Sequence, residues 1–72
     1  MKILEPFDEC YATVTGRCST GVFLLLDNNE EAFAYSFNLN PGTIVLCTVR
    51  RSATDSRRTL VWIDSVVRYA VA

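Results

Sequence analysis

The fold of this chain is decided by residues 11–37, which read YATVTGRCSTGVFLLLDNNEEAFAYSF. The alternation and the β-branched residues of 11–17 are typical of a half-buried strand. Residues 22–27 are apolar on both faces, and residues 32–37 alternate small and large side chains. Ser-Thr-Gly and Asp-Asn-Asn-Glu separate these segments and favour turns. The stretch therefore predicts three short strands joined by tight connections.

The rest of the chain continues in the same way. Pro41-Gly42 breaks it, because proline cannot donate to a strand ladder. Residues 43–51 alternate and predict a fourth strand, and residues 57–67 predict a fifth. No window shows a helical period, and five strands in so short a chain favour closure over a sheet with open edges. We expect residues 1–72 to form a single all-β domain, a small five-stranded antiparallel barrel of the OB type.

Composition excludes several classes of function. The chain has no histidine, which is the commonest general base and the commonest metal ligand. Cys10, Cys18 and Cys47 have neither the spacing of a zinc site nor that of a disulfide framework, and Cys47 is expected in the core. We therefore expect no enzyme, no metal and no cofactor. No apolar run approaches the roughly 20 residues of a membrane span and no secretory signal is present, so a cytoplasmic protein is expected.

Charge is distributed unevenly along the chain. The net charge is −1, but residues 1–45 carry two basic against six acidic residues, and residues 46–72 carry five basic against two acidic residues. Four arginines flank one loop, and closing that hairpin should bring them together: Arg50, Arg51, Arg57 and Arg58. They have two interpretations. In the first, the arginines bind phosphate, which accepts paired hydrogen bonds from a guanidinium. In the second, they form a solvated hairpin end whose charges pair with nearby acids such as Asp55, Glu30 or Glu31.

Aromatic residues also have two interpretations. Phe33, Tyr35 and Phe37 share one face at a period of two. They form either a platform on which bases stack or, as a small barrel favours, part of the core, with Tyr35 the exception because its hydroxyl needs a partner. On the preceding strand, Phe23 and Leu25 are expected to point outward. Such an apolar patch suits base stacking and a protein partner equally well.

Glycines and aromatics together carry a family resemblance. The first strand ends at Gly16, the second begins Gly21-Val22-Phe23-Leu24, Gly42 opens the fourth, and an Asp-to-Arg turn precedes the fifth. Residues 10–66 thereby resemble the RNA-binding OB domain of the ribosomal-protein S-one type. The resemblance implies that Phe23 is the stacking aromatic and that Tyr35 takes the place of an RNA-contacting histidine. It also implies that Asp55 and Arg58 lie near the family's Asp and Arg pair.

The sequence thus favours a non-catalytic module that binds single-stranded RNA or DNA. The residues expected to bind nucleic acid are Phe23, Tyr35, Arg50, Arg51, Arg57 and Arg58. The alternative is a protein-interaction or assembly module, in which Phe23 and Leu25 meet a protein partner or a second copy of the chain. An enzyme has the least support.

Overall fold

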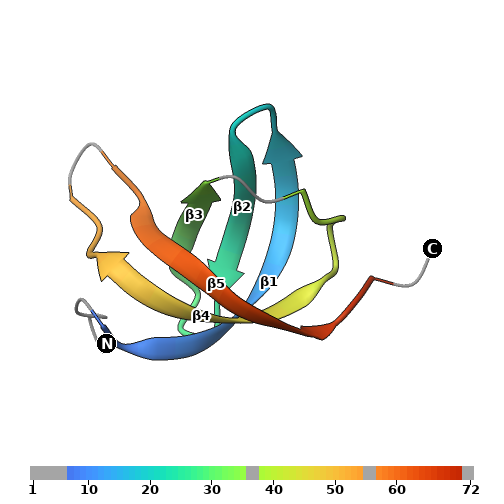
Figure 1. The fold of residues 1–72 in the computed structure, drawn as a ribbon. Helices are drawn as coiled ribbons and strands as arrows, with labels where there is room; N and C mark the ends of the chain where they lie inside the picture. The colour runs from blue at the N-terminus through green and yellow to red at the C-terminus, as the bar shows by residue number, and fades with distance from the viewer. Residues whose placement is uncertain (1–6, 36–37, 55–56, 71–72) are drawn as a thin grey trace.

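Five strands close into a barrel in the computed structural model, which describes residues 7–35, 38–54 and 57–70 (Figure 1). The strands are β1 (Glu9–Cys18), β2 (Gly21–Leu26), β3 (Glu31–Tyr35), β4 (Ile44–Arg51) and β5 (Thr59–Arg68). Their order around the barrel is β1-β2-β3-β5-β4, and β4 pairs with β1 to close it. The predicted all-β barrel of the OB type is confirmed. Within the described ranges, no helix has the length and apolar character needed to cross a membrane.

Strand direction differs from the expected antiparallel arrangement at one pair. Four pairings are antiparallel, whereas β3 and β5 run parallel through Ala32 with Thr59 and Phe33 with Leu60. Directions cannot alternate all the way around a closed ring with an odd number of strands. Closure of the five-stranded ring therefore requires a parallel pair. That pair is β3 with β5, because the chain crosses from the end of β3 to β4 instead of to the neighbouring strand β5.

The barrel interior is filled by the inward residues of each strand. Phe23 and Leu25 lie on the outer side of β2 as predicted, and Cys47 is fully buried as expected. The core consists of Cys10, Ala12, Val14, Val22, Leu24, Leu26, Ala32, Ala34, Val45, Cys47, Val49 and Val61. Each fully buried valine or leucine contributes about 1.5–3 kcal/mol to the free energy of folding. The residues between these positions are left to form the outer surface.

The aromatic residues of β3 lie outside the barrel. Ala32 and Ala34 are buried, whereas Phe33 is half-buried and Tyr35 is exposed. The interpretation that places these aromatics in the core is therefore wrong for Phe33, whereas Tyr35 is exposed as the expected exception. Phe37 lies outside the described residues. Register supplies the reason, because Ala32 pairs with Leu24 and Ala34 with Val22. The large side chains of β2 already fill the interior there, so β3 contributes small ones.

Two connections are held by polar side chains. In the β2–β3 turn, Asn29 has a φ of 70° and the Asn28 Oδ1 accepts a hydrogen bond from the Glu30 amide. This confirms the predicted turn, since asparagine tolerates the left-handed region. After β3, the Arg17 guanidinium donates to the Oδ1 atoms of Asn38 and Asn40. The chain is thereby tied to the end of β1 before it enters β4.

Candidate nucleic-acid interface

Three aromatic rings form a continuous row on the outer surface of β2 and β3. Phe23 and Phe33 face each other across the two strands, with ring centroids 5.2 Å apart and planes at 61°. Phe33 and Tyr35 follow on one strand, with centroids 4.9 Å apart and planes at 81°. These edge-to-face contacts hold the rings in fixed orientations. We call Phe23, Phe33 and Tyr35 the aromatic face.

Gly21 lets the aromatic face form. It is buried at the start of β2, opposite Tyr35. A Cβ atom at this position would lie 2.1 Å from the Ala34 carbonyl oxygen and 2.9 Å from Cζ of the Phe33 ring. The Phe33 ring therefore covers the glycine, in the diagonal position that long side chains reach across paired strands. No larger residue fits at position 21 without displacing β3.

Arginines line a hollow beside the aromatic face. The hollow has a volume of about 320 Å³ and is lined by Phe33, Tyr35, Arg51, Arg57, Arg58 and Leu60. We call it the arginine hollow. Among the residues that the structure describes, no acidic side chain lines it. The Nε of Arg51 is buried and has no hydrogen-bond partner within the described residues. Leaving a buried donor without a partner costs free energy.

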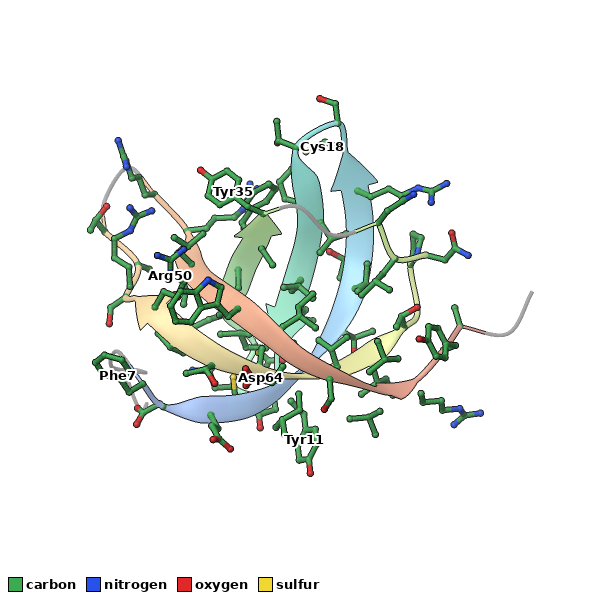
Figure 2. The ribbon with its side chains drawn as sticks, viewed as in Figure 1. Phe7, Tyr11, Cys18, Tyr35, Arg50 and Asp64 are labelled. Atoms are coloured by element: carbon green, nitrogen blue, oxygen red, sulfur yellow. The ribbon has the colours of Figure 1, made fainter. Side chains whose placement is uncertain are left out.

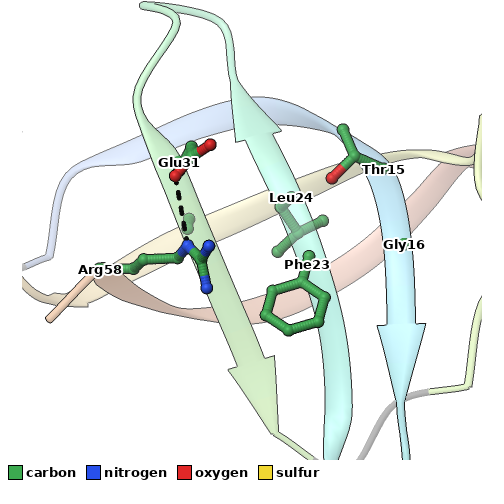
Figure 3. A pocket seen from close by; sticks show the side chains of 7 residues that line it. Thr15, Gly16, Phe23, Leu24, Glu31 and Arg58 are labelled. Atoms are coloured by element: carbon green, nitrogen blue, oxygen red, sulfur yellow. Dashed lines mark hydrogen bonds and ion pairs between the residues drawn. The ribbon is translucent and has the colours of Figure 1, made fainter.

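Arg58 joins the hollow to the aromatic face. Its guanidinium carbon lies 4.9 Å from the centroid of the Phe23 ring, and its Nε is 3.3 Å from an Oε of Glu31 (Figure 3). A second hollow of about 230 Å³ lies on the other side of this contact, next to Gly16. The acid-pairing interpretation therefore holds for Arg58. Both side chains of this ion pair are largely exposed, so water screens the attraction between them and Arg58 can still attract an anionic ligand.

The four arginines do not form one cluster. Arg51, Arg57 and Arg58 meet in the arginine hollow, whereas Arg50 lies over the Trp62 ring, 4.1 Å from its centroid. The predicted grouping is thus correct for three residues and wrong for Arg50. A β-bulge explains the separation, because the β4–β5 register shifts between Val49 and Arg51. Asp55, which the family resemblance includes, lies outside the described residues.

Two aromatic residues on the outer side of the barrel were not among the expected site residues. Phe33, which links the other two rings, was weighed as part of a stacking platform, but the core interpretation was favoured for it. The small-large alternation of β3 is the signal that could have decided the choice, since alanines can occupy the interior in place of aromatics. Trp62 is half exposed on β5. Trp62 follows Leu60 by two positions, so the alternation of a strand places both side chains on one face, and this relation is visible in the sequence.

Cysteine reactivity provides a probe at the edge of this surface. Cys18 is exposed at the end of β1, and hydrogen bonds from Thr20 lower the pKa of its thiol (Figure 2). Burial raises the pKa of the thiols of Cys10 and Cys47. We expect iodoacetamide at neutral pH to modify Cys18 alone in the native protein, because the thiolate is the nucleophile. Mass spectrometry would count the adducts, and more than one in folded protein would contradict the prediction.

Comparisons with known proteins support the fold. No protein-family model matches the chain, and no curated protein matches it. Among solved structures, the chain is similar to the intact alpha subunit of aIF2 from Pyrococcus abyssi, with a TM-score of 0.63 and 26% sequence identity. The match covers 88% of this chain and 29% of that one, so the chain spans less than a third of the subunit's length. The chain has an OB-like fold that it shares with part of that subunit.

Proposed function

We propose that this chain is a non-catalytic binding module for single-stranded nucleic acid, with RNA the first ligand to test. The observation that carries the proposal is the aromatic face with the arginine hollow directly beside it. Proteins that bind single strands combine these two elements, since bases stack on aromatic rings and cationic side chains follow the phosphates. Phe23, Phe33 and Tyr35 stack bases in this proposal, and Arg51, Arg57 and Arg58 bind phosphates.

The position of the surface supports the same function. OB folds bind oligonucleotides on the face of strands 2 and 3, bordered by the loops between strands 1 and 2 and between strands 4 and 5. In Figure 1, β3 lies between the β1–β2 hairpin at the top and the β4–β5 hairpin at the left. The aromatic face is on β2 and β3, and the arginine hollow adjoins the β4–β5 hairpin.

Two further points favour RNA and a non-catalytic role. Residues 10–66 resemble the RNA-binding OB domain of the S-one type, and the similarity to part of the aIF2 alpha subunit agrees with an OB-type binding module. The absence of histidine from the chain removes the commonest acid–base catalyst. Phe23 and Tyr35 keep the roles that the resemblance implies.

Replacing one exposed ring tests the proposal. Tyr35→Leu should weaken binding of fluorescein-labelled oligoadenylate at low salt by roughly tenfold, which is the loss of one base stack. Tyr11→Leu is the matched control, because Tyr11 is 55% exposed and Tyr35 is 56% exposed. In Figure 2, Tyr11 lies on the opposite side of the view from Tyr35. Fluorescence anisotropy measures both affinities.

Amide NMR with the same oligonucleotide locates the contact. Shifts concentrated at the aromatic face and at the arginine hollow would support the proposal. A spectrum that does not change at low salt would refute nucleic-acid binding and would leave the half-buried Phe23 and the exposed Leu25 as a surface for a protein partner or for self-association.

A further inference from the structure

An exposed tryptophan lies outside the proposed binding surface. Trp62 is 51% exposed on the outer side of β5, although its neighbour Val61 is buried. The guanidinium of Arg50 lies over the indole, 4.1 Å from its centroid, and Figure 2 shows Arg50 at the β4–β5 hairpin. Bases stack both on aromatic rings and on guanidinium planes. The pair therefore offers the two chemical surfaces that an unpaired base uses.

The register of β5 connects this pair to the aromatic face. Leu60 pairs with Phe33 of β3 and with Arg51 of β4, and it lines the arginine hollow. Trp62 follows two residues later on the same face of β5, about 7 Å along the strand. The outer surface thus runs from Phe33 across Leu60 to Trp62 without passing through the core.

The β-bulge in β4 places one arginine beside Leu60 and another beside Trp62. Arg51 lies opposite Leu60, and the extra residue of the bulge, Arg50, lies over Trp62. In a regular strand, consecutive side chains point to opposite faces, and one of these two arginines would point toward the interior. Here both lie outside the core beside successive apolar positions, with Arg50 exposed and Arg51 partly buried.

Acidic side chains bound the path beyond Trp62. Asp64 is exposed and accepts a hydrogen bond from Thr48, and Thr48 pairs with Trp62 on one side and with Glu9 on the other. Two carboxylates near these positions would repel a phosphate backbone. The cationic part of the surface therefore ends at Trp62.

We propose that Trp62 and Arg50 form an additional stacking position for a base of the same single strand, reached across Leu60 from the aromatic face. This rests on the proposed function and extends its site by one position around the barrel. Charge favours nucleic acid as the occupant, because among the described residues the path carries Arg50 and Arg51, with Asp64 beyond Trp62 at its end.

The chain contains one tryptophan, so its fluorescence reports this position alone. Oligoadenylates of increasing length should quench the tryptophan emission only when they are long enough to reach beyond the aromatic face. Trp62→Leu should weaken binding of the long oligonucleotides roughly tenfold and leave the short ones unchanged. Trp62→Phe, which keeps a ring, should retain most of the affinity, and Tyr11→Leu serves again as the control for loss of an exposed ring.

The outcomes distinguish this inference from the function on which it rests. If long oligonucleotides bind but neither quench Trp62 nor lose affinity in Trp62→Leu, the additional position is refuted and the aromatic face stands. If no oligonucleotide binds the wild-type protein, both are refuted. Should Trp62→Leu fail to fold, the quenching of the wild-type protein and the affinity of Arg50→Gln decide. We expect Arg50→Gln to weaken only the long oligonucleotides.

Discussion

Gly21→Ala should lower the free energy of unfolding by about 3 kcal/mol or more, the upper end of the range for overpacking a core. The new methyl group would lie 2.1 Å from the Ala34 carbonyl oxygen, and a backbone atom cannot move aside as a side chain can. A domain of this size loses roughly 4–8 °C of melting temperature per kcal/mol. The variant should therefore melt about 12 °C or more below the wild-type protein, or should fail to fold. Thermal unfolding followed by circular dichroism measures the change.

Gly16→Ala is the matched control for this prediction. A Cβ atom at Gly16 would meet only Cδ2 of Phe23, at 3.8 Å, which is an ordinary van der Waals distance. We expect its melting temperature to remain close to that of the wild-type protein. If both glycine variants melted alike, the close approach of β2 and β3 would not explain the requirement for glycine at position 21.

Much of the fold follows from local patterns in the sequence. Alternation sorted the side chains of β1 and β4 onto two faces, and the apolar β2 predicted an outward Phe23. These predictions succeed because a strand has only two faces and one of them must be buried. The boundaries moved by one or two residues: β1 begins at Glu9 instead of residue 11, and β5 begins at Thr59 instead of residue 57.

The position of the β3 aromatics could not be obtained in the same way. A period of two shows that Phe33 and Tyr35 share a face, but it does not show which face is buried. That choice depends on what the neighbouring strands place inside, and Leu24 opposite Ala32 fills the interior. Pairing between strands is not visible in the sequence of one strand, so hydrophobicity alone pointed to the wrong side.

The arginines show a second limit of the same kind. Their closeness along the chain predicted one cluster, and a bulge between Val49 and Arg51 divided them. A bulge changes the direction of every side chain that follows it, yet it depends on the pairing of β4 with β5. Candidate residue types were therefore predictable, whereas the separation of Arg50 from Arg51 required the structure.

Replacing both Arg51 and Arg57 with glutamine should weaken binding of oligoadenylate by at least roughly tenfold at low salt, since a hydrogen bond involving a charged group contributes about 1.5–3 kcal/mol. Both line the arginine hollow, and within the described part of the chain neither stacks on an aromatic ring as Arg50 and Arg58 do. Each phosphate contact to a single strand contributes about 0.7 to the slope of log affinity against log salt concentration. The double variant should therefore lose about 1.4 of that slope, measured by anisotropy over a salt series.

Arg68→Gln separates a local contact from a general effect of charge. Arg68 is exposed at the far end of β5, where it pairs with Ile44 and lines a different hollow with Gly42 and Tyr69. The Arg68→Gln substitution removes one positive charge, as Arg51→Gln or Arg57→Gln alone does. If the hollow binds phosphate, the two single variants reduce the salt slope and Arg68→Gln leaves it nearly unchanged. Equal losses in all three would mean that net charge alone attracts the nucleic acid, and the hollow would have no specific role.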